Sequence, residues 1–356
     1  MAHVVVAVPA SNEAVLIGDC LRALALQQGN MSMEILLLVN NSSDGTAEAA
    51  RAAVPALPCR LHVLEHEFPK SQANAGHARR LAMAKAAMLT DAGGVVMTTD
   101  ADGAVSADWV AANLAAIRAG ADAVCGRAVI DPLDALRIPQ ALHDDDALEV
   151  EFGLRLERIA CLLDPMPHDP WPRHREESGA SIAVRREAFT SCGGVPPVSC
   201  GEDRSLMDAL RRVDARIRHD PEVEVSVSGR IVGRAQDGMA DTIRRRITRQ
   251  DPTLDDALEP VGDRVRRISA RRLTRMAWMD YASRPTLLRH LATELLISAE
   301  RLEGWLTLPH FGSAWALMEA ASPALVRRLV PRRDVEAQIR VADGVLATLV
   351  GSVGVR

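Results

Sequence analysis

The segment 95–103, Val-Val-Met-Thr-Thr-Asp-Ala-Asp-Gly, constrains the fold of this chain more than any other stretch. Its first five residues are typical of a buried strand, and Asp100 and Asp102 follow directly. In an extended backbone, residues i and i+2 point to the same side, so the two carboxylates can converge where the strand ends. Open α/β sheets bind ligands at this end, and two hard oxygen donors suit Mg²⁺ or Mn²⁺ held jointly with phosphates. Asp-Ala-Asp-Gly is also good turn chemistry, so a plain turn is the alternative.

Strand patterns alternate with helical patterns over the first two thirds of the chain. We expect strands over 4–8, 34–39, 60–64, 94–99, 123–129, 178–184 and 223–228, and helices over 14–27, 77–89, 108–119, 147–163 and 201–213. This alternation predicts an α/β fold with a mostly parallel sheet. From residue 238 onward only helical periodicity follows. We therefore expect one domain over 1–235, with 131–177 as a long insertion, and a helical C-terminal extension over 236–356.

Composition limits the class of protein. Hydrophobic residues make up 48% of the chain, which is enough for a full core, and a net charge of −5 argues against a general nucleic-acid binder. The strong preference for arginine over lysine indicates a GC-rich bacterial genome. The six cysteines contain no CxxC pair, so we expect buried thiols in a reducing cytosol.

The chain shows no targeting or membrane-spanning pattern. Its amino terminus enters a strand pattern at once, without the basic and apolar regions of a signal peptide. No apolar run reaches the roughly 18 residues that a transmembrane helix needs. We expect a cytoplasmic protein, with peripheral contact to the inner membrane as the furthest alternative. The arginine-rich tail would then be a dimerisation or lid element with a solvated basic face, or a surface for anionic lipid headgroups.

Four separated motifs lie at or near the ends of the expected strands. They are Pro9-Ala10-Ser11-Asn12-Glu13, Asn40-Asn41-Ser42-Ser43-Asp44-Gly45-Thr46, Asp100-Ala101-Asp102, and the series Ser178-Gly179-Ala180-Ser181, Gly193-Gly194 and Gly201-Glu202-Asp203. In this order, over about residues 3–235, they resemble the nucleotide-sugar glycosyltransferases of family two, which have the GT-A fold. The resemblance implies a metal-dependent transfer of a sugar from a nucleotide-diphosphate sugar to an acceptor hydroxyl, with inversion.

The resemblance also implies roles for individual residues. Asp100 and Asp102 would hold Mn²⁺ or Mg²⁺, with His219 as a candidate third ligand and a surface histidine as the alternative. Asp203 would take the proton of the acceptor hydroxyl as general base, and Glu202 would orient the acceptor. Helix capping at an N-terminus is the alternative for this pair. The residues expected to contact the donor nucleotide are Pro9, Ala10, Asn12, Glu13, Asn41, Arg79 and Asp100.

Some of these donor contacts stay open. The family usually has an aspartate where Asn40 and Asn41 stand, and an amide carbonyl can still accept a hydrogen bond from the base, but without charge. The identity of the donor's base therefore stays open, with a UDP-sugar as the first choice and a GDP-sugar as the second. Arg79 would contact the diphosphate, or else lie on a solvated helix face. A late pattern, Ser228-Gly229-Arg230 with Arg234, resembles the family's sequence near the donor phosphates.

The acceptor is the least defined partner. It is a small molecule, a glycan or a lipid-linked molecule, and a homodimer is one option for the assembly. Trp171, His174, Arg175 and Glu176 of the insertion would line the acceptor pocket, with plain loop packing as the alternative.

Other functions compete with an inverting transferase. A retaining GT-A glycosyltransferase would carry similar donor motifs. A nucleotidyltransferase normally has a glycine-rich, basic loop after its first strand, and residues 9–13 contain neither glycine nor a cation. A non-catalytic nucleotide-sugar-binding protein would not need Asp100, Asp102 and Asp203 together.

Overall fold

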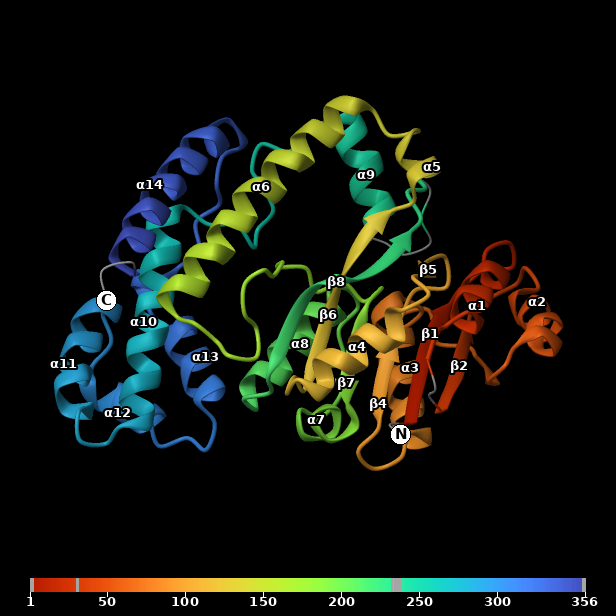
Figure 1. Cartoon of the computed structure of the whole chain (residues 1–356), viewed down its shortest axis with the longest axis horizontal. Helices are drawn as coiled ribbons and strands as arrows, with labels where there is room; N and C mark the ends of the chain where they lie inside the picture. The colour runs from red at the N-terminus through yellow and green to blue at the C-terminus, as the bar shows by residue number, and fades with distance from the viewer. Residues whose placement is uncertain (1–2, 30–31, 232, 234–237, 354–356) are drawn as a thin grey trace. The chain divides into compact units, whose positions relative to one another are not determined.

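The structure is a computed structural model that describes residues 3–29, 32–231, 233 and 238–353 (Figure 1). Over these residues the chain divides into two compact units. Unit 1 takes in residues up to 139, 176–210 and 215–248, and unit 2 takes in 140–175, 211–214 and the residues from 249 onward. The long helix of the segment expected as an insertion thus belongs to unit 2. The expected domain boundary at residue 235 stays a prediction.

Unit 1 is built on an eight-stranded sheet with the order β3-β2-β1-β4-β7-β6-β8-β5. Its strands are β1 (His3–Ala10), β2 (Ser32–Asn40), β3 (Arg60–His66), β4 (Val95–Thr98), β5 (Ala104–Val105), β6 (Ala123–Ile130), β7 (Ile182–Arg185) and β8 (Ile217–Val227). The strands β3-β2-β1-β4 run parallel, as do β6 and β8, whereas β7 and β5 are antiparallel to their neighbours. The α/β prediction is confirmed, with a mixed rather than uniformly parallel second half.

Helices pack on both faces of this sheet, whose central strands are apolar on both faces. The helices of unit 1 are α1 (Ile17–Ala25), α2 (Thr46–Ala53), α3 (Ala75–Leu89), α4 (Trp109–Arg118), α5 (Pro132–Ala135), α7 (Arg186–Ser191), α8 (Glu202–Arg212, whose last two residues belong to unit 2) and α9 (Met239–Thr248), with the short η1 (Val54–Ala56). Alternate residues of β1 enter different cores, because successive side chains of a strand point to opposite faces. Val4, Val6 and Val8 pack with residues of α1 and α4, whereas Val5 and Ala7 pack with residues of α3 and α8.

The strand order creates a switch point in unit 1. The chain runs outward from β1 to β2 and β3, then returns to place β4 on the other side of β1. In open α/β sheets, ligands bind beyond the carboxyl ends of the strands at such a point. Asn12 and Glu13 follow β1 here, and Asp100 and Asp102 follow β4.

Unit 2 is helical, which confirms the helical prediction for the C-terminal region. It contains α6 (Gln140–Leu163), α10 (Val261–Met279), α11 (Arg284–Leu295), α12 (Ala299–Trp305), α13 (Phe311–Ala321) and α14 (Val335–Val353), with η2 (Pro323–Leu325) and η3 (Arg332–Asp334). One core joins α10 to α11, α12 and α13 around residues such as Leu291 and Met318. A second core joins α6, α10 and α14 around Phe152, Ile159 and Ala342.

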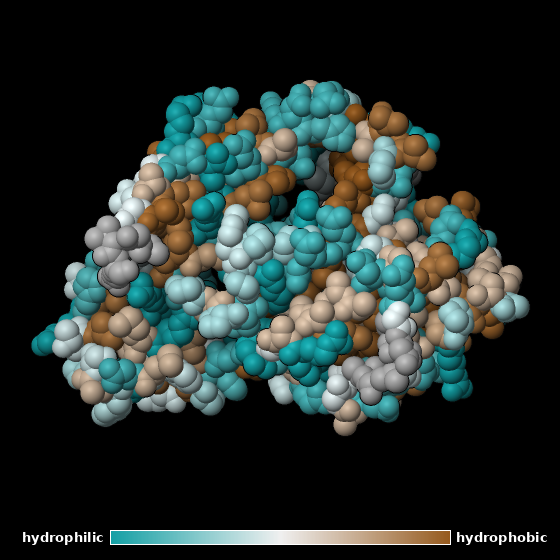
Figure 2. All heavy atoms as spheres, in the orientation of Figure 1, coloured by the Kyte–Doolittle hydropathy of each residue, from teal (hydrophilic) through white to brown (hydrophobic). Residues whose placement is uncertain are grey.

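Hydrophilic and hydrophobic residues are interspersed over the face that Figure 2 shows. Among the helices described, none combines the length and the hydropathy needed to cross a membrane. All six cysteines are free thiols; Cys20 and Cys125 are buried, but Cys200 is exposed, so the expectation of buried thiols is wrong for that residue.

Candidate functional site

The two aspartates lie directly after β4, in the place the sequence predicts. The Asp100 side chain is 33% exposed and that of Asp102 is 20% exposed. Burial, followed by the nearby charge of Asp100, raises the pKa of Asp102 to about 6, although Arg230 acts in the opposite direction. Two carboxylates this close together suit a divalent cation, because its positive charge would offset their mutual repulsion.

Arg230 connects this pair to the loop after β1. One guanidinium nitrogen, Nη2, lies 2.9 Å from Asp102 Oδ2. The same guanidinium donates to both carboxylate oxygens of Glu13, over 2.7 Å and 3.1 Å. Glu13 is only 5% exposed, so its charge is matched by a fork of two hydrogen bonds. Arg234, of the same expected pattern, lies outside the described residues.

Arg79 of α3 forms the second connection and is almost fully buried. Its Nη2 donates to Asp100 Oδ1 over 2.6 Å, and its Nε donates to Glu202 Oε1 over 2.9 Å. Nη1 donates to Thr98 Oγ1 over 2.8 Å and to the carbonyl oxygen of Gly179 over 2.9 Å. Four of the five N–H donors of Arg79 thus bind protein atoms. The guanidinium joins the end of β4 to the start of α8. Arg79 therefore does not lie on a solvated helix face, which was the alternative.

Gly179 is a glycine because Arg79 passes close to it. A Cβ atom built at Gly179 would lie 2.5 Å from Cζ of Arg79. The backbone N–H of Gly179 also donates to Asp203 Oδ2 over 3.0 Å. The segment before β7 is therefore held between two charged side chains from α3 and α8.

Asp203 and Glu202 begin α8, and each has a different environment. Glu202 is buried and its carboxylate is paired with Arg79. Asp203 is half-buried, and its Oδ1 accepts the backbone N–H of Arg204 over 2.8 Å. Burial and the charge of Glu202 raise the pKa of Asp203, and they outweigh its hydrogen bonds with backbone N–H groups and the charge of Arg79. Because Asp203 also binds Gly179 from another element, capping alone does not describe it.

The expected nucleotide-contact residues shape the loops after β1 and β2. Asn12 and Asn41 both adopt positive φ, at 55° and 47°, a conformation that asparagine tolerates better than most residues. Asn12 Oδ1 accepts the backbone N–H of Ser43 over 2.9 Å, which ties the two loops together. The amide of Asn41 pairs in both directions with the backbone of Phe68. Ala10 is buried at the end of β1 beside Pro9. Contacts of these residues with a nucleotide stay a prediction.

His219 lies away from the two aspartates. In the sheet, the backbone partner of His219 is Cys125 of β6. Cys125 is in turn opposite Ile182 of β7, and Ile182 is opposite Thr98 of β4. Three strand spacings of about 4.8 Å place the His219 backbone roughly 14 Å from Thr98. Its ring nitrogen Nε2 lies 3.5 Å from Glu177 Oε1. Among the described residues, no three histidine, cysteine or acidic side chains form a metal cluster. The structure does not bring His219 to the expected metal position.

The expected acceptor residues of the insertion take part in packing contacts. The guanidinium of Arg158 lies 5.6 Å from the ring centroid of Trp171. Arg175 pairs with Asp255 over 3.2 Å, His174 is buried, and Glu176 accepts the backbone N–H of Ala128. Their contact with an acceptor stays a prediction.

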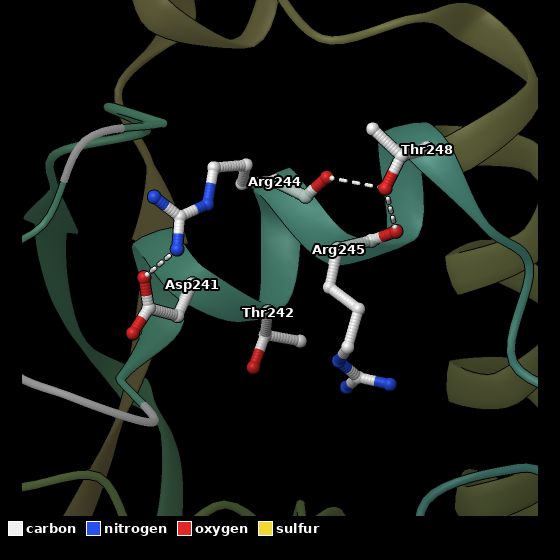
Figure 3. Close-up of a pocket in the computed structure, with 5 residues that line it drawn as sticks. All are labelled: Asp241, Thr242, Arg244, Arg245 and Thr248. Atoms are coloured by element: carbon white, nitrogen blue, oxygen red, sulfur yellow. Dashed lines mark hydrogen bonds and ion pairs between the residues drawn. The ribbon is translucent and has the colours of Figure 1, made fainter.

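A separate recess of about 690 Å³ lies along α9, and Figure 3 shows the residues that line it. Arg244 donates to Asp241 over 2.8 Å within the recess, and the Thr248 hydroxyl donates to the carbonyl oxygens of Arg244 and Arg245. None of the predicted site residues lines it.

Comparisons with known proteins complete the description. The family model described as Glycosyl transferase family 2 matches residues 5–189. No curated protein matches the chain.

Three similar solved structures show distant likenesses. The mannosyltransferase PcManGT from Pyrobaculum calidifontis, in complex with GDP-Man and Mn²⁺, is 19% identical over 98% of this chain and 85% of its own, with a TM-score of 0.47. S. aureus TarS 1–349, in complex with UDP, is 16% identical over 98% of this chain and 92% of its own, with a TM-score of 0.46. Glucosyl-3-phosphoglycerate synthase from Mycobacterium tuberculosis, with Mn²⁺, UDP and phosphoglyceric acid, is 17% identical over 68% of this chain and 76% of its own, with a TM-score of 0.41.

Proposed function

Because the chain belongs to glycosyltransferase family 2, we propose that it transfers a sugar from a nucleotide-diphosphate sugar to an acceptor hydroxyl with inversion, assisted by a divalent cation. Its general activity, glycosyl transfer, follows from the family. One observation carries the finer proposal: the buried Arg79 holds Asp100, which follows β4, and Glu202, which begins α8, in one hydrogen-bonded network. Carboxylates from two distant parts of the chain are thereby fixed around one place.

We assign the cation to Asp100 and Asp102, with substrate phosphate and water oxygens as the remaining ligands. A bound Mn²⁺ or Mg²⁺ would neutralise the charge that grows on the diphosphate as the glycosidic bond breaks. The oxygen donors and the raised pKa of Asp102 support this assignment. Arg230, 25% exposed and beside Asp102, would contact the same phosphates.

The nucleotide would occupy the carboxyl ends of β1 and β2. Asn12 and Asn41 hold the two loops in left-handed conformations, while Glu13 anchors Arg230. Pro9 and Ala10, at the end of β1, would then lie beneath the nucleotide. A UDP-sugar remains the first choice of donor and a GDP-sugar the second. Neutral Asn40 and Asn41 stand where the family usually offers an aspartate to the base, so this loop does not itself identify the base.

Asp203 is the proposed general base. The acceptor oxygen attacks the anomeric carbon, its proton passes to Asp203, and the bonding pair of the glycosidic bond leaves on the diphosphate. Asp203 Oδ1 and Oδ2 each accept a backbone N–H, and each keeps a second lone pair for that proton. A raised pKa brings the carboxylate closer to the working pH and makes it a stronger base. Glu202, paired with Arg79, acts as a positioning residue.

The substitution Asp203→Asn tests the base, because it keeps the shape of the side chain and removes its basicity. Turnover should fall by roughly 10²–10⁴-fold, the usual contribution of general-base catalysis, while the affinity for nucleoside diphosphate changes little. Asp208→Asn, at an exposed position of the same helix, is the matched control. Near-normal turnover of Asp203→Asn would refute the base assignment. A product whose NMR spectrum shows retained anomeric configuration would favour the retaining alternative.

Calorimetry tests the cation. Binding of a nucleoside diphosphate should require Mn²⁺ and should weaken strongly in Asp102→Asn. Asp108→Asn, an exposed aspartate after β5, controls for loss of one charge. Metal-independent binding, or unchanged binding by Asp102→Asn, would contradict the assignment.

A further inference from the structure

One face of α10 in unit 2 carries a line of arginines. Arg264, Arg271 and Arg275 are seven and four residues apart, so at 100° per residue their side chains leave the helix within about 40° of one another. Along the helix axis, Arg271 and Arg275 are separated by only about 6 Å. Such a line of like charges is destabilising unless acidic groups or bound anions neutralise it.

Most of these arginines have acidic partners. Arg264 pairs with Glu157 over 2.6 Å and with Glu259 over 3.8 Å. Arg275 is hydrogen-bonded to Oδ1 of Asp164, and its guanidinium lies 5.5 Å from the ring centroid of Phe311.

Arg271 differs from its neighbours. Its ion pair joins Nη1 to Asp164 Oδ2 over 3.9 Å, and Asp164 is also paired with Arg275. Among the described residues, Arg271 donates no hydrogen bond, and the buried Nε of Arg264 also has no partner. A guanidinium carries five N–H donors, so Arg271 has capacity for an additional acceptor.

The electrostatic surroundings of Arg271 are positive. Burial has the largest effect, and the charges of Arg275, Arg211 and Arg264 add to it, so that the pKa of Arg271 falls to about 10. The charge of Asp164 acts in the opposite direction. The Arg271 side chain is nevertheless 32% exposed, so a small ion can reach it from solvent.

We propose that Arg271, together with Arg275, binds a phosphate group, either free phosphate or a phosphomonoester. The planar fork of a guanidinium matches two oxygens of a phosphate, and the negative charge would relieve the repulsion among the arginines. All of these residues belong to unit 2, whereas Asp100, Asp102 and Arg230 belong to unit 1. The proposal therefore does not depend on the proposed function.

Titration of the full chain with inorganic phosphate tests this site. The experiment uses EDTA, to exclude cation-dependent binding, and constant ionic strength, because salt screens exposed charges. Phosphate that binds the folded state should raise the melting temperature, and Arg271→Gln should weaken the apparent affinity at least tenfold. The control is Arg289→Gln, which removes an exposed arginine of α11 in the same unit. A parallel titration with glycerol phosphate distinguishes the two ligands. Binding tighter than that of inorganic phosphate indicates a phosphomonoester ligand, and weaker binding indicates free phosphate.

A second measurement separates a binding site from a structural arginine. Without phosphate, Arg271→Gln should keep or raise the melting temperature, because it removes a cation repelled by its neighbours. Arg267→Gln should lower the melting temperature, because Arg267 makes three hydrogen bonds with buried Glu259. Equal phosphate affinity in the wild type and Arg271→Gln would overturn the proposal. Loss of phosphate binding in Arg230→Gln, with Arg271→Gln unaffected, would place the phosphate in unit 1 and overturn it as well.

Discussion

Replacing Arg79 by methionine tests whether one buried guanidinium holds the candidate site together. Methionine fills a similar volume but cannot donate the hydrogen bonds to Asp100, Glu202, Thr98 and Gly179. The Glu202 side chain is only 8% exposed, so in Arg79→Met its carboxylate would stay buried and would have lost its counter-charge. The variant therefore isolates the cost of an unpaired charge at the start of α8.

The expected magnitude follows from burial. Breaking a buried ion pair by removing one partner typically costs about 3–5 kcal/mol. The contact with Asp100 adds little, because that side chain is 33% exposed and solvent screening leaves about 0–1 kcal/mol. We expect Arg79→Met to lose about 3–5 kcal/mol of unfolding free energy, a large part of the roughly 5–15 kcal/mol that stabilises a typical protein.

A double-mutant cycle identifies the cause. Glu202→Gln removes the buried charge while keeping an oxygen that can accept from Arg79, and should cost about 1–2 kcal/mol. The combination of Glu202→Gln with Arg79→Met leaves no unpaired buried charge at the start of α8, so it should cost less than the two single variants together, by about 1–3 kcal/mol. Urea unfolding of the four proteins, followed by circular dichroism, measures the cycle. Effects that add to within about 0.5 kcal/mol would show that Arg79 and Glu202 do not depend on each other.

Three further predictions concern single positions. Gly179→Ala should displace the Arg79 guanidinium, because the new Cβ would lie 2.5 Å from its Cζ; we expect a loss of about 2–4 kcal/mol in urea unfolding, and an unchanged midpoint would contradict the close approach. Folding raises the pKa of Asp203, so the folded state binds the carboxyl proton more tightly, and the stability that this proton contributes is lost as the pH rises from about 4 through the raised pKa. The melting temperature of Asp203→Asn should therefore depend less on pH over this interval than that of the wild type. The same pH dependence in both proteins would disprove the shift. His219→Ala should leave the Mn²⁺ affinity measured by calorimetry unchanged, and a large loss would make His219 a metal ligand after all.

The strand pattern of the sequence predicts the first half of the sheet well. The apolar runs of β1, β2 and β4 are buried on both faces, so few alternatives exist for them. The antiparallel insertion of β7 between β4 and β6 was not predictable, because a short apolar run carries no information about its direction. The membership of α6 in unit 2 also depends on contacts with α10 and α14, which lie more than one hundred residues further along the chain.

The motifs predicted where the site lies but not which side chains pair within it. The carboxylates could be identified because they follow strand or glycine patterns at fixed positions. The pairing of Arg79 with Glu202 joins residues 123 positions apart, and that of Arg230 with Glu13 joins residues 217 positions apart. A single sequence contains no signal for such pairs. One signal could have helped: Gly179 suggests a close approach by another group, although not which group.

The two arginines of the site differ in what they can still bind. Arg79 is 5% exposed and uses four of its five donors on protein oxygens, so it has little capacity for a substrate phosphate. Arg230 is 25% exposed and contacts two carboxylates, one of which, Asp102, is a proposed cation ligand. A cation held by Asp102 would weaken the electrostatic reason for the Arg230 contact, and the Arg230 guanidinium would then be available to a substrate diphosphate. The diphosphate contact expected of Arg79 therefore fits Arg230 better, while Arg79 keeps the carboxylates in place.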